Sequence, residues 1–102
     1  MKLTHLKIIT PSGIFLETDT DLVTLRTTEG YKGCQYGRNP FVASLVADKL
    51  FIGSDKSNTQ KVYDIYNGLV YVEEEYTTIF TDKIEEVTSE FRYSDLKSAI
   101  KS

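Results

Sequence analysis

The sequence of 102 residues has one cysteine, one histidine, two prolines and no tryptophan. The single cysteine, Cys34, permits no internal disulfide and no multi-cysteine zinc site, which suits a reducing compartment. No run of residues approaches the ~20 apolar positions that a membrane-spanning helix needs, and the first residues lack the apolar core of a secretory signal. We therefore expect a cytoplasmic protein that meets a membrane only through a protein partner.

An excess of positive charge is also missing. Fifteen acidic residues outnumber twelve basic ones, which gives a net charge of −3. Nucleic-acid binding requires a clustered basic surface, whereas the lysines and arginines here are scattered along the chain. The composition therefore argues against nucleic acid as the main partner.

Short strand-like segments separated by turn residues make up most of the chain. Tyrosine, phenylalanine, threonine, valine and isoleucine are frequent, and these residues favour strands. Alternation of apolar and polar residues predicts strands at residues 3–10, 14–17, 21–25, 41–46, 49–53, 60–66, 69–73 and 77–81. This spacing predicts an all-β fold, an antiparallel β-sandwich of about eight to ten strands.

Two turns in this pattern predict hairpins between consecutive strands. Ala47-Asp48 separates the strands at 41–46 and 49–53, and Asn67-Gly68 is the strongest short hairpin signal in the chain. The three carboxylates at residues 73–75 predict a solvated hairpin tip. Consecutive strand residues point to opposite faces, so these carboxylates do not converge on a cation.

The end of the chain has a different pattern. Leu96 and Ile100 are four residues apart and follow Ser94, a suitable N-cap. The sequence therefore predicts a β-sandwich domain at residues 1–87 and a short helical tail at residues 88–102.

The segment 29–40 is the strongest candidate for a binding site. It holds glycines at 30, 33 and 37 and a proline at 40, and its one small apolar residue is Cys34. Core packing alone does not explain such a segment, and binding residues are frequent on loops held by a rigid scaffold. A phosphate site is disfavoured, because a strand-like run and not a helix follows Pro40.

Catalytic motifs are absent from the sequence. His5 lies in the middle of a predicted strand, and its spacing from Cys34 gives no support to a nucleophilic dyad, although a small hydrolase that uses Cys34 remains an alternative. Tyr63, Tyr66, Tyr71 and Tyr76 fall on two neighbouring predicted strands. They would form either an aromatic contact surface or cross-strand pairs within the sheet.

An ordered series of short motifs carries a family resemblance. The motifs are LKIITPSGIF at residues 6–15, DLVTL at 21–25, TTEGYKG at 27–33, PFVASL at 40–45, NGLVYV at 67–72 and TTIFTD at 77–82. Over residues 3–87 the chain resembles the N-terminal β-sandwich of the epsilon subunit of F-type ATP synthases. The resemblance implies a non-catalytic subunit of the rotating central stalk, without a cofactor or a metal.

The resemblance also implies the partners. They are a gamma-like subunit and a c-ring or a substitute output partner of an F1 or F1-like rotary ATPase. The matching contact residues are Glu29, Gly30, Tyr31, Lys32, Gly33, Gln35, Tyr36, Arg38, Asn39 and Pro40. Within this segment, Gln35, Tyr36 and Arg38 stand where the family usually has a leucine-proline pair and a histidine, so the partner at these positions is expected to differ.

The family normally continues into a C-terminal hairpin of two helices that can inhibit rotation. Residues 85–102 are too few for two useful helices and a turn, so the resemblance implies that this inhibition and ATP sensing are absent. The alternative function is a free-standing β-sandwich adaptor that binds a protein partner through an edge strand or through the segment 29–40.

Overall fold

The computed structural model describes residues 2–54 and 60–87, and the helix predicted near residues 94–101 lies outside them. The described residues form ten strands and no helix. They are β1 (Thr4–Thr10), β2 (Gly13–Thr20), β3 (Val23–Thr27), β4 (Gly30–Cys34), β5 (Phe41–Leu45), β6 (Asp48–Ile52), β7 (Lys61–Ile65), β8 (Gly68–Val72), β9 (Tyr76–Thr81) and β10 (Ile84–Glu86). The predicted all-β class and number of strands are confirmed.

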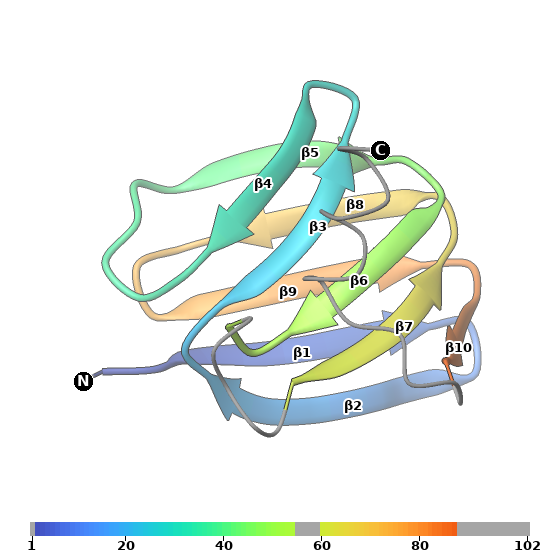
Figure 1. The fold of residues 1–102 in the computed structure, drawn as a ribbon, viewed down its shortest axis with the longest axis horizontal. Helices are drawn as coiled ribbons and strands as arrows, with labels where there is room; N and C mark the ends of the chain where they lie inside the picture. Colours follow the sequence, from blue (N-terminus) through green and yellow to red (C-terminus); the bar gives the residue numbers. More distant parts are fainter. Residues whose placement is uncertain (1, 55–59, 88–102) are drawn as a thin grey trace, which may run out of the picture.

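The strands form one curled sheet that folds over on itself. Its order is β10-β7-β6-β3-β5-β8-β9-β1-β2, and β4 pairs with β3. In Figure 1 a front layer of β4, β3, β6 and β7 lies over a back layer of β5, β8, β9, β1 and β2. The link between the layers is narrow, since β3 and β5 share the single pair Thr27–Leu45. The arrangement is that of a β-sandwich.

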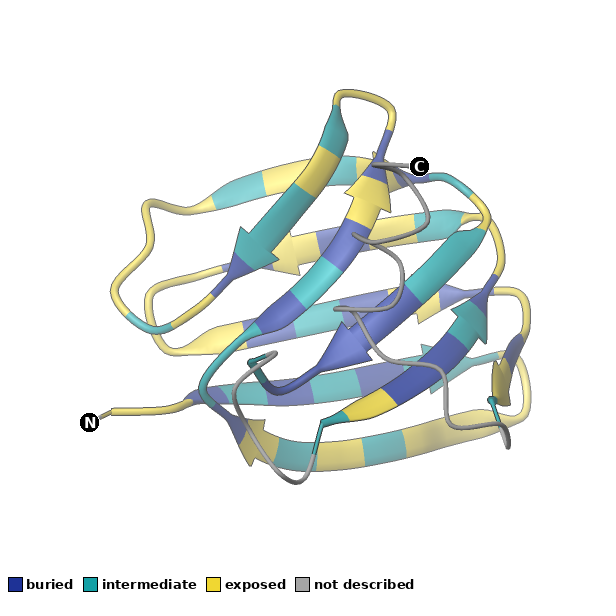
Figure 2. Ribbon diagram, in the orientation of Figure 1, coloured by how far each residue is buried: buried dark blue, intermediate teal, exposed yellow. Residues whose placement is uncertain are grey.

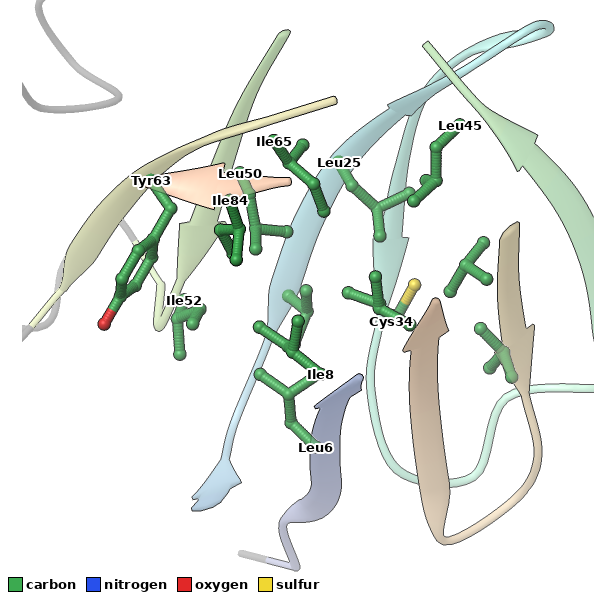
Figure 3. Close-up of a cluster of buried hydrophobic side chains, with 14 residues drawn as sticks. Leu6, Ile8, Leu25, Cys34, Leu45, Leu50, Ile52, Tyr63, Ile65 and Ile84 are labelled. Carbon is green, nitrogen blue, oxygen red and sulfur yellow. The ribbon is translucent and has the colours of Figure 1, made fainter. Parts of the chain in front are cut away.

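The core lies between the two layers. In β1, Leu6 and Ile8 are buried while His5, Lys7 and Ile9 point the other way, as the alternation predicts. Figures 2 and 3 show the same alternation across the sheet and the buried side chains that converge between the layers. The cluster comprises Leu6, Ile8, Val23, Leu25, Cys34, Leu45, Leu50, Ile52, Tyr63, Ile65, Val70, Val72, Ile79 and Ile84.

Both hairpins predicted from the turn residues are wrong. Strands β5 and β6 follow each other in the chain but do not pair, because β3 lies between them and the chain crosses from one layer to the other. Likewise β7 pairs with β6 and β10, whereas β8 pairs with β5 and β9. The predicted acidic tip at 73–75 is correct, since it joins the antiparallel pair β8–β9.

Two further differences between the predicted and the observed strands come from long-range pairing. Strands β1 and β9 are parallel, so the sheet is not purely antiparallel. Strand β2 continues through the break predicted after Glu17, because residues 18–20 pair with residues 4–6 of β1.

A bulge at Phe15 turns its ring towards Tyr63 of the other layer, with ring centroids 5.7 Å apart. Bulges of this kind blunt an edge strand against pairing with another chain.

The four tyrosines do not form one surface. Tyr63 is buried in the front layer, and Tyr66 follows β7. Tyr71 on β8 meets Phe80 edge to face at 5.6 Å, and Tyr76 on β9 meets His5 at 6.1 Å. The prediction that all four lie on two neighbouring strands is therefore wrong, and Tyr71 alone belongs to a larger apolar surface described below.

Candidate partner-binding surface

The segment 29–40 is not a simple loop. Its first half, β4, pairs with β3 along the whole register from Val23–Cys34 to Thr27–Gly30. Gly30 has a φ of 107°, which favours glycine in the tight turn between the strands. Thr27 Oγ1 stabilises that turn by accepting from the Glu29 amide at 3.1 Å and donating to the Gly30 carbonyl at 2.9 Å. The predicted contact residues therefore begin on a braced β-hairpin.

Tyr31 on the outer side of this hairpin belongs to a charged cluster. The Tyr31 hydroxyl and Arg26 Nη1 both donate to Asp48 Oδ2, at 3.1 and 3.0 Å. Burial acts to raise the pKa of Asp48, but donors from the Lys49 amide, Arg26 and Tyr31 outweigh it, and the pKa lies below its ordinary value. The cluster holds Tyr31 in place while leaving the residue 39% exposed.

Cys34 faces the core from β4 and has no exposed surface (Figure 3). Burial raises the pKa of its thiol to about 12, whereas a nucleophilic cysteine needs a lowered pKa. His5 lies on the outward side of β1, so the two residues do not form a dyad. The hydrolase alternative does not fit the structure.

We expect Cys34 to react with a thiol reagent at least about 100-fold more slowly in the folded protein than in urea, because reaction requires local opening of the sandwich. The measurement is the labelling rate at neutral pH, with the denatured chain as the reference. A folded-state rate close to that of a free cysteine would contradict the burial of this thiol.

The second half of the segment turns along one end of the sandwich. The Gly37 amide donates to the Glu74 carbonyl at 2.8 Å, and Gly37 has a φ of 83°. The Tyr36 hydroxyl accepts from Lys2 Nζ at 3.3 Å. Tyr36 thereby points towards the first residues of the chain and away from the hairpin tip.

The structure brings five predicted contact residues into one groove of about 490 Å³. They are Glu29, Lys32, Arg38, Asn39 and Pro40, and the groove continues over Phe41, Val42 and Ala43 of β5. Lys32 Nζ lies 3.6 Å from Glu29 Oε1, and the Arg38 guanidinium lies 5.5 Å from the centre of the Phe41 ring. The other predicted contact residues lie outside this groove. Tyr31 and Tyr36 line other parts of the surface, and Gly30 and Gly33 belong to the backbone of the hairpin. The backbone carbonyl of Gln35 accepts a hydrogen bond from the Arg38 amide at 3.4 Å.

An apolar surface lies beside this groove on the outer side of the back layer. We call it the apolar face, and its residues are Ile9, Ile14, Val42, Leu69, Tyr71 and Phe80. The strand register makes it continuous, since Val42 pairs with Tyr71, Leu69 with Phe80, Phe80 with Ile9 and Ile9 with Ile14. Val42 is 60% exposed and Phe80 42% exposed. Contiguous exposed apolar surface of this kind marks interaction sites.

The apolar face was not predicted from the sequence, although strand β8 contains a signal for it. In β8 the run Gly68–Val72 places Val70 and Val72 in the core and leaves Leu69 and Tyr71 outside. A strand that is apolar on both faces is typical of one covered on both sides.

A charged cluster borders the apolar face. His5 Nδ1 lies 2.7 Å from Asp19 Oδ1, and His5 Nε2 lies 2.8 Å from Glu17 Oε2. These hydrogen bonds to Glu17 and Asp19 hold the pKa of His5 above its ordinary value. In residues 2–54 and 60–87, no three side chains of the metal-binding types converge on a common point. No helix that could cross a bilayer occurs in the same residues.

Comparison with known proteins identifies relatives of this fold. Residues 3–87 match the family described as ATP synthase, Delta/Epsilon chain, beta-sandwich domain. The ATP synthase epsilon chain of Mycoplasma mobile is 40% identical over 82 residues, which are 80% of this chain and 58% of that protein. The epsilon chain of Mycoplasmopsis pulmonis is 36% identical over 81 residues, 79% of this chain and 57% of that protein. The chain thus spans less than two thirds of the length of these relatives.

Two solved structures share the fold. One is a chain of the Euglena gracilis mitochondrial ATP synthase, with a TM-score of 0.78, 20% identity and coverage of 99% of this chain and 63% of that one. The other is a chain of the Tetrahymena thermophila mitochondrial ATP synthase, with a TM-score of 0.68, 18% identity and coverage of 96% and 86%. At these identities the likeness is one of fold.

Proposed function

Since this chain belongs to the ATP synthase delta/epsilon chain family by its β-sandwich domain, we propose that it is a non-catalytic, epsilon-like subunit of an F1 or F1-like rotary ATPase. It sits in the central stalk, turns with a gamma-like subunit and passes torque to a c-ring or a substitute output partner. It is cytoplasmic and meets the membrane only through the complex. The observation that carries the proposal is the family match over residues 3–87.

The apolar face is the surface proposed for the gamma-like subunit. Its six residues come from β5, β8, β9, β1 and β2 of one hydrogen-bonded layer, and all of them except the half-buried Ile9 are exposed. A subunit that transmits torque needs a stiff contact, and hydrogen-bonded strands supply one. Tyrosine, phenylalanine and leucine on such a face supply the apolar area that stable interfaces bury.

The segment 29–40 is the surface proposed for the second contact of the subunit. The groove of Glu29, Lys32 and Arg38 opens onto the apolar face through Val42, so one partner or two adjoining partners can cover both. The mixed charges of the groove suit a polar rim around the apolar contact.

Co-purification with a gamma-like subunit tests the proposed function directly. The full chain, expressed with alpha-, beta- and gamma-like subunits, should elute with them as one complex. Recovery of this chain alone under conditions in which the other subunits assemble would count against a stalk role and favour the free-standing adaptor.

Replacing Tyr31 and Arg38 together by alanine should weaken assembly about 10-fold or more, because aromatic and arginine side chains commonly carry interface energy. The measurement is the affinity of the double variant for the partner complex. Lys83→Ala is a matched control, since Lys83 is also an exposed cation over an aromatic ring but lies beyond β9. Unchanged assembly of the double variant would remove the segment 29–40 from the interface.

A further inference from the structure

His5 has hydrogen-bond partners at both ring nitrogens. Nδ1 faces Asp19 Oδ1 at 2.7 Å, and Nε2 faces Glu17 Oε2 at 2.8 Å. A neutral imidazole has one N–H donor and one lone pair, and a lone pair aimed at a carboxylate oxygen is repulsive. Both contacts are favourable only in the imidazolium form, so the geometry selects the protonated ring.

Charged and titratable groups surround His5 from each neighbouring segment. Lys7 on the same strand places Nζ 3.8 Å from Glu17 Oε2, and the Tyr76 ring on β9 meets the imidazole edge to face. His5 also lines a groove of about 620 Å³, whose other lining residues are Lys2, Leu3, Asp19, Tyr36, Glu75 and Tyr76. Lys7 lies beside Glu17, and Lys2 donates to Tyr36. Asp19 instead forms its ion pair with the protonated His5 ring.

The position of His5 allows its positive charge to stabilise the edge strand β2. Strand β2 ends the sheet, and among the described strands it pairs with β1 alone. The contacts from His5 to Glu17 and Asp19 therefore add side-chain bridges to the backbone pairing of this edge strand. His5 also shares the outward side of β1 with Ile9, so the bridges lie at the border of the apolar face.

We propose that His5 is a proton-operated clamp, which as imidazolium holds the edge strand β2 against β1 through both Glu17 and Asp19 and on losing its proton can donate to only one of these carboxylates and releases the other. Release makes the border of the apolar face one unit more negative and loosens the second half of β2. A further step, which rests on the proposed function, is that the gamma-like subunit binds more weakly at alkaline pH.

The sign of the pH dependence follows from the direction of the shift. Because the pKa of His5 is raised in the folded protein, its stabilisation is complete below the ordinary value of 6.5 and is lost as the pH rises through the folded pKa. The hydrogen bond from His5, aided by Lys7, lowers the pKa of Glu17, so this carboxylate stays charged into the acidic range. The clamp is therefore closed in weakly acidic solution and opens as the pH rises through the folded pKa of His5, which lies above 6.5.

Proton NMR of the full chain tests the clamp, because His5 is the only histidine and its ring signals need no assignment. We expect the ring to titrate above 6.5 and the amides of residues 17–20 to shift with the same midpoint. In His5→Gln, which cannot titrate, that midpoint should vanish from the amides. A ring midpoint at or below 6.5, or amides that ignore the ring, would overturn the clamp.

Stability provides a second measurement with matched variants. Between about pH 6 and about pH 8.5 the folding constant of the native sequence should fall by roughly two- to five-fold relative to His5→Gln, the size expected of exposed ion pairs. His5→Lys keeps a permanent cation and should show no such fall. Equal pH dependence in all three proteins would overturn the clamp.

The docking step has its own readout. If the clamp titrates and the affinity for the gamma-like subunit also falls in alkali, the docking step is supported. Equal affinity at both pH values overturns the docking step alone. Absence of binding at every pH overturns the proposed function, while the NMR titration still decides whether the clamp exists.

Discussion

Replacing Gly68 by alanine should destabilise the sandwich by about 3 kcal/mol or more, one of the largest effects open to a single methyl group. A Cβ at Gly68 would overlap the carbonyl oxygen of Phe80 and lie 2.9 Å from Thr81 Cα. These are backbone atoms of the paired strand β9, since Gly68 pairs with Thr81. They cannot move without breaking the β8–β9 ladder.

Urea unfolding of Gly68→Ala and of Gly33→Ala gives a matched comparison. Gly33 also lies in a strand, but a Cβ there would meet the Leu22 Cδ1 atom at 3.2 Å, and the end of a flexible side chain can move. We expect Gly33→Ala to change the free energy of unfolding by less than about 1 kcal/mol and Gly68→Ala to lower the Tm by more than about 12 °C. Similar stabilities for the two variants would refute the close contact.

Gly68 also explains why one strong sequence signal was misleading. Asn67-Gly68 indicates a two-residue hairpin, and a turn does occur there, but the strands on either side belong to different layers. The glycine is needed because β9 passes close to it, and β9 begins eight residues later in the chain. Turn residues such as these predict that the chain changes direction. They do not predict which strand lies beside the turn.

Strand positions were predictable where one face of the strand is apolar. Leu6 and Ile8 alternate with polar residues, so β1 and its buried face could be read from the sequence. Strand β4 was missed because its inward positions hold Gly30, Lys32 and Cys34, which give no apolar period. That strand is specified by its pairing with β3, a contact that periodicity does not encode.

The candidate site, too, was predictable from the sequence in one part and not in another. The motifs identified the segment 29–40, and the structure gathers Glu29, Lys32 and Arg38 from it into one groove. The apolar face could not be located in this way, because its residues come from five strands that meet only after folding. The distribution of exposed apolar residues over one layer is information that only the pairing of the strands supplies.

Replacing Leu69 and Phe80 together by serine should lower the affinity for a gamma-like subunit by about 100-fold or more. The few side chains that dominate an interface lie near its centre, and truncating one of them costs about 2 kcal/mol or more. Leu69 and Phe80 are directly paired across β8 and β9 at the middle of the apolar face, and each exposes about two fifths of its surface. The fold should survive the double substitution because neither side chain is part of the core cluster.

Isothermal titration of the gamma-like subunit with each variant measures this effect, with Tyr66→Ser as the control. Tyr66 is 41% exposed, almost the same as Phe80, but it follows β7 outside the apolar face. Loss of one exposed aromatic ring should matter at the apolar face and not at Tyr66 if the gamma-like subunit binds where we propose. Native affinity in the double variant, together with weaker binding of Tyr66→Ser, would move the contact to the other layer and reverse the orientation of the sandwich on its partner.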